Sequence, residues 1–196
     1  MMKNIVVLKT SVNGDQSISN QVVNAIVARS VAKYPDVKVI ERDLNANPVP
    51  VLTSETVAAI RAGKNESAVQ QQATALADEL IDELTHADHI VIGLPRYNFT
   101  VPATFKAYVD YIARPRITFR YGENGPEGLL PNVPVTVVIA SGGSYAGQPY
   151  DFMTGWVKQV LGFVGLTNVN VIQVENTATQ REQALTTAQT TIDTLF

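Results

Sequence analysis

The sequence predicts an α/β protein with a doubly wound, five-stranded parallel sheet and helices on both faces. Five short strand-like segments, rich in β-branched residues, are spread along the 196 residues, and those over residues 5–8 and 89–94 are apolar runs. Such runs are typical of strands that are buried on both sides. Segments with helical spacing of apolar residues separate the five strand-like segments. Strands that alternate with helices form parallel sheets with right-handed crossovers, so this fold class follows.

The first strand and helix enclose a loop rich in hydroxyl groups. Residues 5–8 form the apolar run, and the loop over residues 10–19 holds serines, amides and a glycine but no lysine or arginine. Apolar residues then follow at helical spacing: Val22, Val23, Ile26, Val27 and Val31. Ser17 or Ser19 is the expected N-cap. The N-terminus of this helix suits a phosphate, or else the serines only cap a helix and fill a turn.

Two common phosphate-binding motifs are missing from this loop. It contains neither G-x-x-x-x-G-K-[ST] nor G-x-G-x-x-G. The usual nucleotide triphosphate loop and the usual dinucleotide fingerprint are therefore not expected.

The second strand and the two helices after it are read from alternation and from end signals. Residues 37–42 alternate as a strand, and Asn and Pro mark a loop after them. A short helix is expected over residues 54–62, because Gly63 follows its end. A longer helix is expected over residues 66–86, with an apolar face.

The third strand is expected over residues 89–94, which are apolar apart from His89, and a loop with two aromatic residues follows it. A helix is expected over residues 102–113, since Pro102 suits a first turn. Residues 115–131 are irregular, with one short extended segment over 117–121 and many turn formers after it.

The last two strands are expected over residues 133–140 and 169–174. A glycine-rich loop follows the first of these, and helices are expected over residues 151–162 and 179–195. No repeat, low-complexity tract or linker interrupts the chain, so residues 1–196 are expected to form one domain.

Composition excludes several functions. The net charge of -3 comes without a basic cluster, so nucleic-acid binding is not expected. With no cysteine, the chain has no disulfide framework and no thiolate nucleophile. Two histidines without a third ligand favour neither a metal site nor a Ser-His-Asp triad. No signal peptide and no stretch of ~20 apolar residues is visible, so no membrane association and a cytoplasmic location are expected.

Three loops of different chemistry are expected at one edge of the sheet. The strand order 2-1-3-4-5 makes the first, third and fourth strands neighbours, with a ligand site at their carboxyl ends. The first loop offers hydroxyls, residues 95–99 offer two aromatic rings and an amide, and residues 141–147 offer unobstructed backbone N–H groups. Together they suit a flat ring on a phosphorylated tail. Alternatively, Gly142 and Gly143 only form a turn, and Tyr97 and Phe99 only pack against the next helix.

The sequence resembles the FMN-dependent NADH:quinone oxidoreductases known as azoreductases. The matching stretches are residues 8–11, 17–20, 42–44, 95–99, 118–129 and 161–165. The resemblance implies a flavodoxin-like fold, a homodimer and one FMN per subunit. It implies FMN contacts at Ser11, Ser17, Ile18, Ser19, Arg96, Tyr97, Asn98, Phe99, Ser141, Gly142, Gly143 and Ser144. It implies substrate contacts at Arg61, Phe119, Tyr121 and Phe163.

The same resemblance implies a two-electron, ping-pong reaction in which NADH or NADPH reduces FMN, and a quinone, azo compound or nitroaromatic is then reduced. No catalytic residue is expected, because the chemistry takes place on FMN. A flavodoxin-type electron carrier without a substrate pocket is the alternative, and a nucleotide-sensing module is a third. The long segment over residues 115–131 favours an enzyme, since a carrier needs no wall around a substrate.

The sequence departs from the family pattern at two places. Arg96 replaces a methionine that is common in the family, and residues 141–144 read Ser-Gly-Gly-Ser where Ser-Arg-Gly-Gly is common. Three roles are open for Arg96: it tunes the flavin, it binds an anionic substrate or the dinucleotide phosphates, or it points into solvent.

Overall fold

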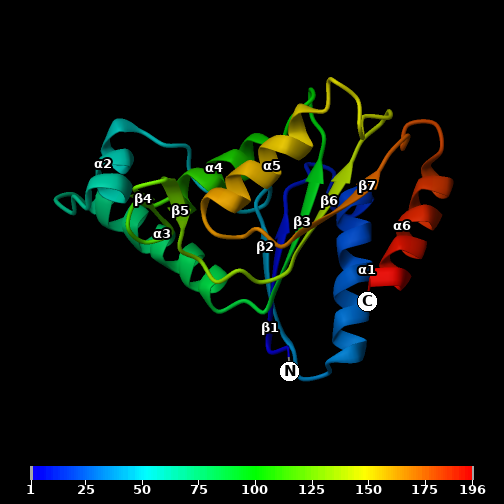
Figure 1. Ribbon diagram of the computed structural model, residues 1–196, viewed down its shortest axis with the longest axis horizontal. Coiled ribbons are helices and arrows are strands. Elements are labelled where there is room, and N and C mark those ends of the chain that lie inside the picture. The colour runs from blue at the N-terminus through cyan, green and yellow to red at the C-terminus, as the bar shows by residue number, and fades with distance from the viewer. Residues whose placement is uncertain (1, 196) are drawn as a thin grey trace.

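A five-stranded parallel sheet forms the centre of the protein (Figure 1). The computed structural model describes residues 2–195. The strands of this sheet are β1 (Asn4–Lys9), β2 (Lys38–Asp43), β3 (His89–Pro95), β6 (Val135–Ala140) and β7 (Val169–Val174). Their order is β2-β1-β3-β6-β7, and each neighbouring pair is parallel. The predicted order 2-1-3-4-5 is therefore confirmed.

Helices cover both faces of the sheet. They are α1 (Ile18–Lys33), α2 (Ser54–Ala62), α3 (Ala68–Thr85), α4 (Ala103–Ile112), α5 (Phe152–Phe163) and α6 (Arg181–Leu195), with a 3-10 turn η1 (Gly14–Gln16) before α1. Figure 1 shows α1 and α6 on one side of the sheet and α3, α4 and α5 on the other. The chain thus has the doubly wound architecture that the sequence predicted.

Alternating side chains of β1 supply the two halves of the core. Ile5 and Val7 pack with the apolar face of α1, whereas Val6 and Leu8 pack with the cluster on the opposite side. This two-residue period is what a strand covered on both faces requires. Val31, the last apolar residue of the pattern in α1, is 38% exposed. It lies about 140° around the helix from Ile26, because five residues exceed one turn of 3.6.

A small antiparallel hairpin lies beside the C-terminal end of α5. It consists of β4 (Phe119–Gly122) and β5 (Gly125–Gly128). The extended segment was expected over 117–121, but β5 was not, because its sequence Gly-Pro-Glu-Gly has little strand preference. Backbone contact holds it in place: a Cβ at Gly128 would lie 2.1 Å from the Gly165 nitrogen. The Leu130 N–H also donates to the Val164 carbonyl at 2.9 Å.

No helix among residues 2–195 combines the length and the apolar character needed to cross a membrane.

Candidate flavin-binding cavity

A cavity of ≈ 200 Å³ lies where the three predicted loops meet. Its walls come from the loop after β1, the loop after β3, the start of the loop after β6, and the segment that leads into α6. The lining residues are Ser11, Asn13, Gln16, Ser17, Ile18, Ser19, Pro95, Arg96, Tyr97, Ala140, Gly142, Thr177 and Arg181. The structure therefore brings the three loops together at the carboxyl edge of the sheet, as expected.

A wider hollow of ≈ 690 Å³ lies elsewhere, between β2 and α3. Its lining holds three carboxylates, Glu79, Asp82 and Glu83, against one lysine, Lys38. This excess of negative charge disfavours a phosphate, so the smaller cavity is the better candidate despite its size.

The first loop ends in the N-terminus of the 16-residue helix α1. Ser17 is the N-cap, and its side chain accepts a hydrogen bond from the Asn20 N–H at 3.3 Å. The Ser17 and Ser19 hydroxyls are buried and lie 3.0 Å apart. Thr10 fastens the start of the loop to β3 by donating to the Gly93 carbonyl at 2.7 Å. Hydroxyls and helical N–H groups thus point to one spot that suits an anion.

The second loop is a tight turn with an unusual backbone. Tyr97 and Thr100 exchange two backbone hydrogen bonds, of 3.0 and 3.1 Å. Asn98 and Phe99 between them have φ values of 47° and 71°, in the left-handed region. Asn tolerates this region, but a bulky residue such as Phe is strained there. Strain of this kind gathers at ligand sites, and here it holds the Phe99 ring at the surface.

The tyrosine of this turn ties the second loop to the first. The Tyr97 hydroxyl lies 3.3 Å from the Ser11 hydroxyl and accepts the Val12 N–H at 3.2 Å. The two loops therefore form one connected wall of the cavity.

Arg96 is buried, so the solvent-facing role that the sequence left open is wrong. Its side chain is 1% exposed, and Nη2 donates to the Asp151 carboxylate at 2.8 Å. The guanidinium also stacks 4.3 Å from the centre of the Tyr145 ring. Among the described residues its Nε and Nη1 have no hydrogen-bond partner. Arg96 thus joins the loop after β3 to the loop after β6.

Asp151 receives more than one hydrogen bond in this arrangement. It caps α5 by accepting from the Thr154 N–H at 3.2 Å and from the Thr154 hydroxyl at 2.7 Å. Burial acts to raise the pKa of the Asp151 carboxyl, but the bonds from Thr154 and Arg96 outweigh it and hold that pKa below its usual value. The carboxylate is therefore charged and balances the Arg96 cation.

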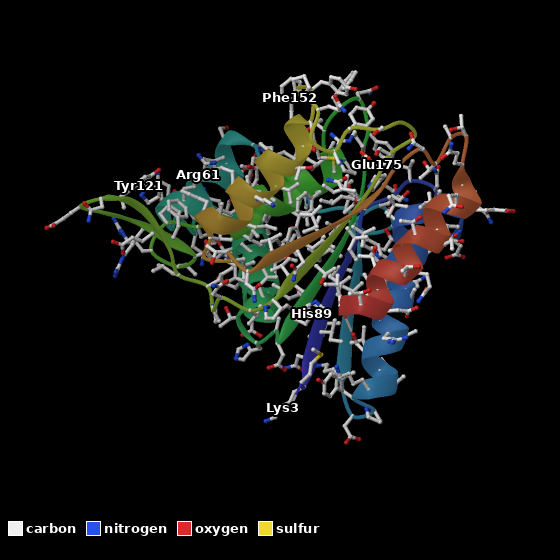
Figure 2. The ribbon with its side chains drawn as sticks, turned by 45° about the vertical axis from the view of Figure 1, so that its right-hand side comes forward. Lys3, Arg61, His89, Tyr121, Phe152 and Glu175 are labelled. Atoms are coloured by element: carbon white, nitrogen blue, oxygen red, sulfur yellow. The ribbon has the colours of Figure 1, made fainter. Side chains whose placement is uncertain are left out.

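The third loop differs from the prediction of open backbone N–H groups. Glu175 directly follows β7 and accepts hydrogen bonds from the N–H groups of Tyr145 and Ala146, at 2.5 and 2.7 Å (Figure 2). It also accepts from the Ser144 hydroxyl at 3.3 Å. An internal carboxylate thus occupies donors that the sequence assigned to a ligand. Gly142 still lines the cavity.

Ser141 at the start of this loop is fixed by its backbone. Its N–H donates to the Val174 carbonyl at 2.9 Å, and its carbonyl accepts from Thr177. Its buried Oγ has no partner among the described residues. Its neighbours in the sequence, Ala140 and Gly142, line the cavity, so this hydroxyl is a candidate contact for a polar ligand.

The four predicted substrate residues lie away from the cavity. Phe119 contacts Phe163 with ring centres 4.2 Å apart and Tyr121 at 5.7 Å. Tyr121 is 77% exposed, and Figure 2 shows it on the same side of the molecule as Arg61. Helix α5 separates this aromatic cluster (Phe119, Tyr121 and Phe163) from Asp151, and its 12 residues span about 18 Å.

Sequence reasoning missed Arg181 and Glu175. Both belong to the segment after β7, which carries no recognisable motif. The only available signal was topology, because the carboxyl end of the strand beside β6 also lies at the cavity edge.

Comparison with known proteins agrees with the fold described above. A family model described as "Flavodoxin-like fold" matches residues 3–195. An FMN-dependent NADH:quinone oxidoreductase of Alcanivorax borkumensis is 46% identical over 173 residues, which cover 88% of this chain and 87% of the relative. An FMN-dependent NADH:quinone oxidoreductase 1 of Photobacterium profundum is 44% identical over 186 residues, or 93% and 92% of the two chains.

Solved structures show the same fold. An azoreductase from Bacillus anthracis superposes with a TM-score of 0.88 at 26% identity, covering 99% of this chain and 98% of the other. A second structure from that organism, an FMN-dependent NADH-azoreductase in complex with FMN, gives a TM-score of 0.86 at 23% identity, with 98% and 97% covered.

Proposed function

This chain belongs to the family of proteins with the flavodoxin-like fold, and we propose that it is an FMN-dependent oxidoreductase that passes electrons from NADH to quinones or azo compounds. Relatives at 44–46% identity over most of the chain carry that name. The observation that carries the proposal is the cavity in which hydroxyls at a helix N-terminus meet a strained aromatic turn.

The donors around the cavity fit the phosphate of FMN. The buried hydroxyls of Ser17 and Ser19 lie at the N-terminus of α1, where backbone N–H groups and the helix dipole favour an anion. The Oγ of Ser141, which has no partner among the described residues, is a further candidate donor. We propose the remaining contacts of the cofactor at Ser11, Ile18, Arg96, Tyr97, Asn98, Phe99, Gly142, Gly143 and Ser144.

When bound, FMN supplies the two-electron redox chemistry of the reaction. The task of the protein is to hold the ring and to exclude water. The turn at Tyr97–Thr100 presents Phe99, whose ring packs edge-on against Tyr145 at 6.0 Å. We propose a ping-pong order, in which donor and acceptor use the same exposed face in turn, and a range of acceptors that includes nitroaromatics.

We also propose that the protein is a homodimer. The aromatic cluster lies about a helix length from Asp151, whose ion-pair partner Arg96 lines the cavity. We propose that a second copy places its own aromatic cluster over the cavity. Substrate contacts at Arg61, Phe119, Tyr121 and Phe163 then belong to the assembled site. A cytoplasmic location remains a prediction.

The test is whether the purified protein is yellow and turns over. Anaerobic NADH should bleach the flavin absorbance, and a quinone should restore it. Initial rates at several fixed quinone concentrations should give parallel double-reciprocal lines. Sedimentation should show twice the 21.2 kDa mass of the chain. A protein that holds FMN but reduces neither quinones nor azo compounds would favour the flavodoxin-type carrier, and a fully active monomer would overturn the dimer.

A further inference from the structure

We propose that Arg181 supplies a positive charge to the phosphate end of the cavity and makes the site select FMN over riboflavin. This inference rests on the proposed function, because it takes the flavin phosphate to lie beside Ser17 and Ser19. It assigns to α6 a positive charge that the loop after β1 does not carry, since residues 10–19 contain no lysine or arginine.

The fold brings Arg181 to the loop after β1 from the far end of the chain. Arg181 is the first residue of α6, and this helix packs beside α1 (Figure 1). Its Nη2 donates to the Gln16 carbonyl at 3.3 Å, directly before the Ser17 N-cap. Arg181 lines the cavity together with Ser17 and Ser19. One hydrogen bond thus anchors the guanidinium, and its other N–H groups remain for a ligand.

Charge separates Arg181 from the other cation of the cavity. The lining contains two arginines and no carboxylate. Arg96 is neutralised by Asp151 at 2.8 Å. Arg181 has no carboxylate within 4.0 Å among residues 2–195. Its positive charge is therefore not balanced inside the protein, and a phosphate is the natural counterion for a planar, multidentate donor.

A second observation also indicates a missing acceptor. Arg96, which is 1% exposed and lines the cavity, has two nitrogens without a partner in the described structure. Ser141 Oγ is also buried without a partner among the described residues, and its sequence neighbours Ala140 and Gly142 line the cavity. Buried donors are normally paired, so the walls of the cavity lack the acceptor oxygens that a phosphorylated ligand brings.

The experiment compares two ligands that differ only in the phosphate. Apoprotein of the full chain is titrated with FMN and with riboflavin, and quenching of flavin fluorescence gives each Kd. In Arg181→Gln the Kd for FMN should rise roughly tenfold, the low end for a hydrogen bond to a charged group because Arg181 is exposed. The Kd for riboflavin should not change, and Arg181→Lys should recover part of the loss.

Arg29→Gln is the matched control. Arg29 also connects α1 with α6, through Asp193 at 2.8 Å, but near the opposite end of α1. The Arg29→Gln substitution removes one positive charge from the same pair of helices, and it should leave the Kd values for FMN and riboflavin unchanged. The salt dependence of FMN binding should become shallower in Arg181→Gln alone.

Each other outcome has a definite meaning. Equal losses for FMN and riboflavin would show that Arg181 only shapes the loop, and unchanged affinities would show that it touches no phosphate. Either result overturns this inference and leaves the proposed function intact. A parent protein that binds neither flavin would overturn the proposed function itself, and this inference with it.

Discussion

Replacing Arg96 by methionine tests whether the buried ion pair holds the two cavity loops together. The Arg96 and Asp151 side chains are 1% and 8% exposed, so their attraction is little weakened by water. Removing one partner of a buried pair costs 3–5 kcal/mol. The Asp151 carboxylate keeps both hydrogen bonds from Thr154, which places the loss near the low end. We therefore expect Arg96→Met to lower the free energy of unfolding by about 3 kcal/mol at pH 7.

The measurement is urea unfolding of a double-mutant cycle. Arg96→Met, Asp151→Asn and the double variant are compared with the parent at equal FMN concentration. The coupling energy between the two positions should reach at least about 1 kcal/mol, because the residues share one ion pair. Additive losses would refute the structural role of the pair.

The same variant has a predictable pH dependence. In the parent, the lowered pKa of Asp151 adds stability that is present above its unfolded value and lost as pH falls through the folded value. In Arg96→Met that pKa rises, since burial is no longer opposed by the cation. Protonation then relieves the buried charge, so the difference between variant and parent should shrink from pH 7 to pH 4. A constant difference over this range would contradict the assignment.

The ion pair also bears on the flavin. The Asp151 carboxylate cancels most of the electric field of Arg96 at a distance. The effect of Arg96 on the flavin potential, one of the roles that the sequence left open, should therefore be small. We expect Arg96→Met to shift the two-electron potential by less than about 30 mV, which equals 1.4 kcal/mol. A larger shift, measured by dye equilibration, would show that the flavin experiences the unbalanced cation.

Four further changes test other parts of the structure. Ser17→Ala combined with Ser19→Ala should weaken FMN binding by at least about 3 kcal/mol, since each lost hydrogen bond to a charged group is worth roughly 1.5–3 kcal/mol. If equilibrium dialysis gave the same FMN affinity as the parent, the placement of the phosphate at this loop would be wrong. Gly128→Ala should destabilise by about 2 kcal/mol in urea, because the new Cβ meets the Gly165 backbone. Its control Gly155→Ala meets no atom within 4 Å and should stabilise α5 by about 0.5–1 kcal/mol. Phe99→Gly should relieve about 1 kcal/mol of backbone strain and yet slow quinone reduction; faster or equal turnover would remove Phe99 from the site. Burial lowers the pKa of His89 to about 4, so the unfolded chain takes up a proton first and stability should fall from pH 6.5 toward pH 4. His89→Gln should flatten this slope, and an unchanged slope would assign it to other groups.

Most of the fold was predictable from residue patterns. Apolar runs and alternating patterns located each strand of the central sheet. Two serines were candidates for the N-cap of α1, and the structure has Ser17 in that position. The hairpin strand β5 was not predictable from strand preference, because the close contact of Gly128 with the backbone of Gly165, far along the chain, holds it in place. The exposure of Val31 was not predictable, because apolar character alone does not fix a position on a helix face.

The site was predictable only where its residues lie in order along the chain. The loops after β1 and β3 were recognisable from their serines and from their two aromatic residues, respectively. The burial of Arg96 depends on Asp151, and the closure of the third loop depends on Glu175, both many residues away. Pairings of this kind leave no local pattern, since an isolated acid after a strand is compatible with many roles.

The contact between Gly128 and Gly165 has a consequence for how the hairpin, with its proposed substrate contacts, can vary in sequence. The hairpin β4–β5 is joined to the turn after α5 by main chain packed on main chain and by the Leu130–Val164 hydrogen bond. Phe119 adds a side-chain contact to Phe163, but the main-chain attachment does not depend on the exposed side chains of the hairpin. The exposed side chains of the hairpin, such as Tyr121, can therefore be substituted in evolution or by design, while the two glycines keep the hairpin in place.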